Sequence, residues 1–185
     1  MKKIIGIIIV ILIGWALWHA YKTSTAPQGP SSQAPTNTQV TSGHPDASKA
    51  TFTFEDGPIT FKDGKSEIKI ADSSAIQETE MTNTIGYGDI NNDDKEDMAG
   101  VIIQTGGGSG TFFYLAAYVS GPLAYKGSNA VFLGDRISPQ SVSIKNGVIN
   151  VSYLDRKPDE PFDAEPTVKT SKDFTFSKGE LIPTE

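Results

Sequence analysis

The sequence contains no cysteine and only two histidines, His19 and His44. The lack of cysteine excludes disulfide bonds, thiolate nucleophiles, cysteine-ligated zinc and the lipid-modified cysteine of an exported lipoprotein. Neither histidine lies in the part of the chain that we expect to fold. Nucleophilic Ser–His pairs and a histidine-ligated zinc hydrolase are therefore excluded there, and catalysis would have to use carboxylates, lysine or serine.

Basic residues are scarce in the C-terminal part of the chain, which has a formal net charge of −6 overall. Residues 1–49 hold four of the 16 basic and one of the 22 acidic residues, which leaves residues 50–185 with 12 basic and 21 acidic residues, a net charge of −9. Such a domain is repelled by nucleic acid and by anionic lipid headgroups. We expect no nucleic-acid partner.

Only the N-terminus has a long apolar run. Residues 4–21, which follow Lys2 and Lys3, would span about 27 Å as a helix, close to the thickness of the hydrocarbon core. Lysines mark the cytoplasmic end, and aromatic residues favour the opposite interface, here Trp15, Trp18 and Tyr21. We expect residues 1–21 to be a single-pass anchor in the cell membrane, with a cytoplasmic N-terminus and an extracytoplasmic C-terminal domain. The alternative is a cleaved signal peptide, although the apolar run exceeds the usual length.

Residues 22–49 lack the apolar side chains that a core needs. They are rich in Ser, Thr, Pro, Gln and Asn, and Val40 is their one large aliphatic residue. Such a segment cannot bury enough apolar surface to offset the entropy lost on ordering. We predict a disordered linker, with His44 solvated within it.

Residues 50–185 show strand patterns and little helical periodicity. The continuous apolar runs 99–103 and 112–119 predict central strands buried on both faces. Asp63-Gly64 and Asn146-Gly147, each between alternating runs, predict hairpin turns. Residues 168–176 predict a last long strand, and residues 73–81 are the best candidate for a helix. We expect a mostly antiparallel β domain with at most one short helix.

An acidic segment precedes the first apolar run and has the order of oxygen ligands that calcium prefers. Asp89, Asn91 and Asp93 occupy positions 1, 3 and 5, Lys95 would offer its backbone carbonyl at position 7, and Asp97 a carboxylate at position 9. These residues predict a structural Ca²⁺ site. The alternative is a tight turn in which the same side chains cap backbone amides without an ion.

The acidic segment resembles the calcium loops of EF-hand, dockerin and integrin-type propeller proteins. Asp94 replaces the usual glycine at position 6, and Gly100 stands where an EF-hand has its glutamate, so the likeness to the propeller type is greater. More widely, residues 84–176 resemble an uncharacterised β domain of bacterial exported proteins and lipoproteins. The resemblance is carried by Tyr87-Gly88-Asp89-Ile90-Asn91-Asn92-Asp93, by residues 107–116 (GGSGTFFYLA) and by Leu133-Gly134-Asp135-Arg136-Ile137. It implies an exported β domain and no particular activity.

Two further segments have compositions typical of loops. Residues 106–110 are glycine-rich but lack the lysine of a phosphate-binding loop, so a hairpin connection or a ligand-contacting loop is expected. Residues 159–165 are acidic and proline-flanked, which is typical of an exposed loop.

Three functions stay open: a non-enzymatic module that binds an envelope protein or polymer, a carboxylate-dependent hydrolase of an envelope polymer, and a purely structural envelope protein. A hydrolase predicts a cleft with two carboxylates about 5–10 Å apart. A binding module predicts an exposed aromatic or apolar patch, with Phe162 or Tyr125 as candidates.

Overall fold

The computed structural model describes residues 43–161 and 163–184, which form strands and connecting turns without a helix. The predicted anchor, residues 1–21, lies outside this range, and no helix within it is long and apolar enough to cross a membrane. The mostly antiparallel β fold predicted from the sequence is confirmed, and every strand pairing within the sheets is antiparallel.

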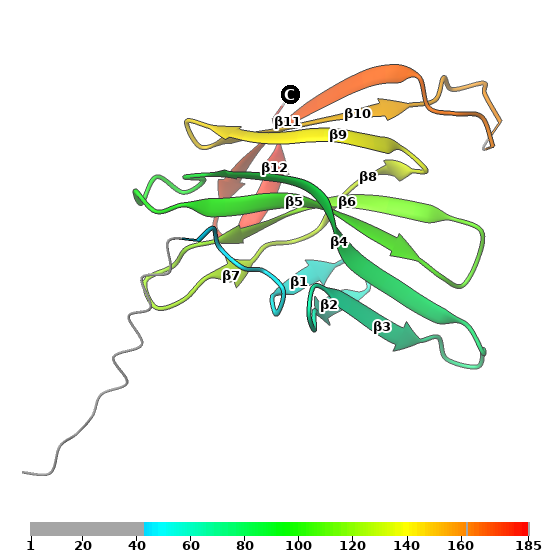
Figure 1. The fold of residues 1–185 in the computed structure, drawn as a ribbon, viewed down its shortest axis with the longest axis horizontal. Helices are drawn as coiled ribbons and strands as arrows, with labels where there is room; N and C mark the ends of the chain where they lie inside the picture. Colours follow the sequence, from blue (N-terminus) through cyan, green and yellow to red (C-terminus); the bar gives the residue numbers. More distant parts are fainter. Residues whose placement is uncertain (1–42, 162, 185) are drawn as a thin grey trace, which may run out of the picture. The chain divides into compact units, whose positions relative to one another are not determined.

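The strands form three sheets (Figure 1). The largest has six strands: β3 (Lys65–Lys69), β4 (Ile76–Gly88), β5 (Asp97–Thr105), β6 (Thr111–Val119) and β7 (Lys126–Gly127) in that order, with β8 (Val131–Asp135) also paired to β6. A four-stranded sheet has the order β12 (Glu180–Pro183), β11 (Val168–Ser177), β10 (Val148–Asp155) and β9 (Ser138–Lys145). The third is the hairpin of β1 (Thr51–Phe54) and β2 (Gly57–Thr60).

The six-stranded sheet is covered on both faces, with the four-stranded sheet on one side and the β1–β2 hairpin on the other (Figure 1). On β5, Ala99 and Val101 pack toward the four-stranded sheet, whereas Met98 and Ile102 pack toward the hairpin. Because successive side chains of a strand point to opposite faces, a strand between two layers needs an apolar residue at every position. The continuous runs on β5 and β6 were therefore correctly predicted as central strands.

Glycines let the two large sheets approach closely at β4 and β9. A Cβ atom at Gly86 would lie 2.5 Å from the carbonyl oxygen of Val142, and one at Gly88 would lie 2.9 Å from Ile144 Cβ. Any larger side chain at these positions would push β9 away from β4. The turn of Asn146 and Gly147, both with positive φ, then returns the chain from β9 to β10 as the sequence predicts.

Two local predictions were wrong in part or in whole. The expected helix at residues 73–81 is absent, because β4 begins at Ile76 and pairs with β3 and β5. Ser73 instead accepts the backbone N–H of Ala75 within the turn before β4. The Asp63-Gly64 turn forms as expected, but its flanking strands β2 and β3 enter different sheets.

Residues before the expected domain boundary at residue 50 also pack on the β domain. Ala47 and Ala50 are buried in the core beneath the hairpin, and the carbonyl of Ser48 accepts the N–H of Gly64. Residues 43–49, which the sequence assigns to the linker, therefore pack on the β domain.

Candidate functional site

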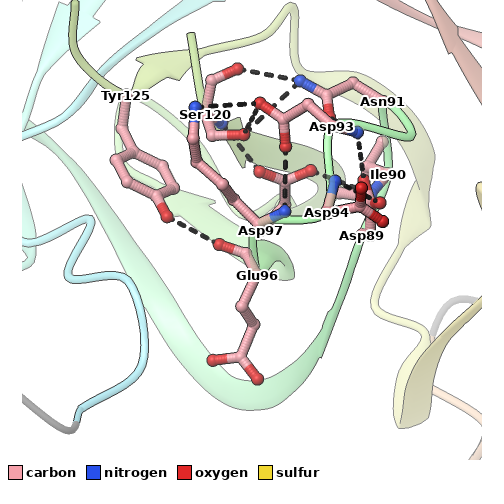
Figure 2. Close-up of polar contacts among 10 residues, drawn as sticks. Asp89, Ile90, Asn91, Asp93, Asp94, Glu96, Asp97, Ser120 and Tyr125 are labelled. Atoms are coloured by element: carbon pink, nitrogen blue, oxygen red, sulfur yellow. Dashed lines mark hydrogen bonds and ion pairs between the residues drawn. The ribbon is translucent and has the colours of Figure 1, made fainter.

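The acidic segment forms the connection between β4 and β5 at one end of the six-stranded sheet. Figure 2 shows four of the predicted ligand residues close together, namely Asp89, Asn91, Asp93 and Asp97. The fifth, Lys95, contacts Asp93. Asp89 follows the last residue of β4, and Asp97 is the first residue of β5. This acidic loop, residues 89–97, also contacts the segment after β6 through Ser120. Because all five predicted ligand residues lie within positions 89–97, the fold of this one connection brings them together.

Asp97 is the anchor of the acidic loop. Its side chain is fully buried, with 0% of the residue exposed. One carboxylate oxygen accepts the N–H of Ile90 at 2.8 Å, and the other accepts the N–H of Ser120 at 2.7 Å. Hydrogen bonds to a charged acceptor are about twice as strong as neutral ones, so this carboxylate joins the start of the loop to the end of β6.

Asp89, Asn91 and Asp93 cap backbone amides within the loop. Asp89 accepts the N–H groups of Asp93 at 3.2 Å and Asp94 at 2.9 Å, and Asn91 Oδ1 accepts the N–H of Asp93 at 3.1 Å. Asn92 and Asp94 have φ values of 60° and 61°, a left-handed conformation that short polar residues tolerate best. The loop thus has the hydrogen bonding of successive Asx turns.

Ser120 connects to the loop at two further points. Its hydroxyl donates to Asp93 Oδ2 at 2.8 Å, and its carbonyl accepts Asn91 Nδ2–H at 2.9 Å. The hydrogen bond from Ser120 is the main reason why the pKa of Asp93 lies below its usual range, with the Lys95 backbone and side chain adding to the effect. Sequence reasoning missed Ser120, because nothing in the local pattern after β6 marks it as a partner of the loop.

The donor types suit calcium, but their oxygens already serve the loop itself. Every carboxylate oxygen of Asp89, Asp93 and Asp97 accepts an N–H or O–H, and Lys95 Nζ lies 3.3 Å from Asp93 Oδ2. Within residues 43–161 and 163–184, no group of three or more His, Asp or Glu side chains is arranged to hold a metal ion. Calcium binding therefore stays a prediction.

The rim of the acidic loop holds the N-terminal segment and the β6–β7 connection. His44 Nδ1 lies 2.6 Å from Glu96 Oε2, and the His44 ring stacks on Tyr87 with a centroid distance of 3.9 Å. His44 thus contacts the domain rather than only solvent. Tyr125 donates its hydroxyl to the carbonyl of Glu96 at 2.7 Å and stacks on Tyr118. Tyr125 therefore stabilises the rim of the loop. Phe162, the other aromatic residue predicted for a binding patch, lies outside the described residues.

The glycine-rich segment 106–110 is a hairpin connection between β5 and β6, as the sequence predicts. Arg136, between β8 and β9, and Arg156, just after β10, hold this segment in place. Arg136 donates to the carbonyl of Ser109, Asp135 accepts the N–H of Thr111 at 2.9 Å, and Arg156 donates to the carbonyls of Asp135 and Arg136. These contacts give the arginines a structural role at the end of the sheet opposite to the acidic loop.

An aromatic cluster lies on the face of the six-stranded sheet that bears the β1–β2 hairpin, with Phe132 exposed and Phe112 and Tyr114 half-buried. It consists of Phe112 and Tyr114 on β6 and Phe132 on β8, and we call these three residues the aromatic surface. Phe132 is 52% exposed and contacts Tyr114 edge to face at a centroid distance of 5.5 Å. Tyr114 in turn contacts the buried Phe54 at 5.1 Å, which joins the surface to the core. The sequence did not single out these residues, because their spacing is that of any half-buried strand.

The acidic loop and the aromatic surface are the two features from which a function can be argued. The loop is internally bonded around the buried Asp97, whereas the Phe132 side chain of the aromatic surface is exposed. A comparison of the chain with protein-family models, curated proteins and solved structures finds no significant match in any of the three.

Proposed function

We propose that the chain is a membrane-tethered extracytoplasmic binding module that recognises an envelope partner with its aromatic surface. The exposure of Phe132 beside Tyr114 and Phe112 is the observation that carries this proposal. Leaving a phenylalanine half in water forgoes roughly 1 kcal/mol or more of burial, which a partner would recover on binding. Residues 1–21 are the proposed anchor, and the linker lets the domain reach away from the membrane surface.

The hydrogen bonds of the acidic loop argue against a hydrolytic role for its carboxylates. A carboxylate that acts on a polymer has to reach the bond that it cleaves. Asp97 is enclosed, and both oxygens of Asp97 and of Asp89 are bonded to backbone amides of the protein. We therefore assign the loop to stability: it fixes the ends of β4, β5 and β6.

Calcium is the ion that the loop would take, with a structural role. The loop has five acidic residues against one lysine between positions 89 and 97, so a cation would relieve their mutual repulsion. Each carboxylate oxygen has a second lone pair, and movement of the Lys95 ammonium away from Asp93 would open one ligand position. The ion would strengthen a brace that the hydrogen bonds already form.

The binding role can be tested by sedimentation with purified cell envelopes. Residues 43–185 should co-sediment with envelopes, and Phe132→Ala should release them into the supernatant. Leu123→Ala is the matched control, because Leu123 is 100% exposed but lies on the β6–β7 connection, away from the aromatic surface. Equal sedimentation of all three proteins would contradict the proposal.

A further inference from the structure

We propose that the aromatic surface binds the cationic side chains of a basic peptide segment. This inference rests on the proposed binding function and names the chemistry of its ligand. Two features of the surface carry it: the angles between its rings and the charge of the turn beside it.

The rings of the aromatic surface are inclined to one another. The planes of Tyr114 and Phe132 meet at 63°, and those of Phe112 and Phe132 meet at 58° with centroids 6.3 Å apart. Phe54 continues the series, at 74° to Tyr114. Inclined rings offer faces and edges in several directions, which is the arrangement of aromatic sites for ammonium and guanidinium groups.

A flat carbohydrate ring requires a different arrangement. A sugar that stacks on several aromatic side chains needs their faces in one plane, and angles of 58° and 63° do not provide it. The polar neighbours of the surface are also engaged. Gln104 receives the hydroxyl of Tyr114 at 3.4 Å and donates to Thr79 at 3.3 Å. The geometry therefore favours a cation over a glycan.

The charge next to the aromatic surface is negative. Glu55 and Asp56 are exposed in the turn between β1 and β2, immediately after Phe54. They lie near enough to Tyr114 to contribute, after burial, to raising the pKa of its hydroxyl. On its other side Phe132 borders a groove of about 510 Å³ whose charged residues, Lys172 and Asp173, are opposite in sign. Of these two neighbours, the Glu55–Asp56 turn adds net negative charge, which complements a basic partner.

The acidity of the whole domain acts in the same direction. The net charge of −9 on residues 50–185 attracts cationic segments from a distance. The aromatic surface would then bind the lysine and arginine side chains that this field attracts. Their charged groups make cation–π contacts with the rings, and their apolar stems pack on them.

The test measures binding of fluorescently labelled hexalysine to the full chain in a nonionic detergent, by anisotropy at two salt concentrations. Phe132→Ala should weaken binding about three- to five-fold, the loss of one exposed cation–π contact. The double variant Glu55→Gln/Asp56→Asn should weaken binding and reduce its salt dependence. The charge-matched control is Glu67→Gln/Glu78→Gln, an exposed cross-strand pair on β3 and β4, which should bind as the parent protein does.

Three outcomes would overturn the proposal: no binding of hexalysine, equal losses for the two charge variants, or no effect of Phe132→Ala. The second would mean attraction to overall charge without a site. Sedimentation with envelopes distinguishes failure of the proposed binding function from failure of the proposed ligand class. If Phe132→Ala abolishes envelope binding while hexalysine does not bind, the binding function stands and only the ligand class is wrong. If neither responds to Phe132→Ala, both are wrong.

Discussion

Replacement of Asp97 by asparagine tests whether the acidic loop is a structural brace. Asparagine keeps the shape of aspartate but has one acceptor oxygen, so its amide group would face the N–H of either Ile90 or Ser120, donor against donor. Losing a hydrogen bond to a charged acceptor costs about 1.5–3 kcal/mol, and a buried N–H without a partner costs about 1–3 kcal/mol. We therefore expect a loss of about 3 kcal/mol or more in the free energy of unfolding.

The assay is denaturant and thermal unfolding of residues 43–185, since Ser42–Glu185 forms one compact unit. A loss of about 3 kcal/mol is a large part of the 5–15 kcal/mol that typically stabilises a domain, and should lower the midpoint by roughly 10 °C. Amide exchange at Ile90 or Ser120 should accelerate more than elsewhere. Asp94→Asn makes the same chemical change at an exposed residue of the same loop and should cost less than about 0.5 kcal/mol. A loss below about 1 kcal/mol for Asp97→Asn would mean that the Asp97 carboxylate does not brace the loop.

Three further predictions concern the loop and the layers around it. Calcium at 10 mM should stabilise the domain by about 1–3 kcal/mol if the loop binds with the affinity of extracellular modules, and Asp93→Ala should remove the effect; unchanged midpoints with calcium and EDTA would exclude the ion. Because the pKa of Asp93 is lowered from 3.8 in the folded protein, its contribution is present above that pH and is lost as the pH falls below it. Ser120→Ala should raise the pKa of Asp93 toward 3.8 in an NMR titration, and no change would mean that Ser120 is not its main partner. Gly86→Ala should destabilise the fold by roughly 1–3 kcal/mol, because its Cβ would lie 2.5 Å from a backbone oxygen of β9, whereas Gly108→Ala meets nothing within 4 Å and should be neutral; similar unfolding curves for both would contradict this packing.

The sequence predicted best those strands whose continuous apolar pattern shows that both faces are buried. The runs 99–103 and 112–119 have no polar break, and a strand buried on two sides has no other pattern. Asn146-Gly147 was equally informative, because a type I′ hairpin turn needs positive φ at both positions, as Asn146 and Gly147 have. In these places the local chemistry alone determines the structure.

The predicted helix at residues 73–81 failed because its pattern is ambiguous over so short a segment. Ser73 can cap a helix or close a turn, and Thr79 lies on a face that either structure could bury. This segment forms part of strand β4 because it pairs with β3 on one side and with β5 on the other. Tertiary pairing of this kind cannot be read from a nine-residue window.

The sequence marks out the acidic loop but not its partners elsewhere in the chain. The spacing of Asp89, Asn91, Asp93 and Asp97 identified the loop, because the side chains that can turn inward are set by local geometry. Ser120 lies 23 residues beyond Asp97, and only the pairing of β5 with β6 brings it to the loop. The aromatic surface likewise depends on which strand β8 joins, and so it became visible only in the folded chain.

Site-specific photo-crosslinking in living cells tests the central claim most directly. A photoreactive phenylalanine analogue would replace Phe132 in the full chain, and Leu123 in a control chain, since both positions are exposed. If the aromatic surface binds an envelope component, position 132 should give discrete adducts that added hexalysine weakens, and position 123 should give few or none. Equal labelling at the two positions, or no adduct at position 132, would contradict a binding role for the aromatic surface.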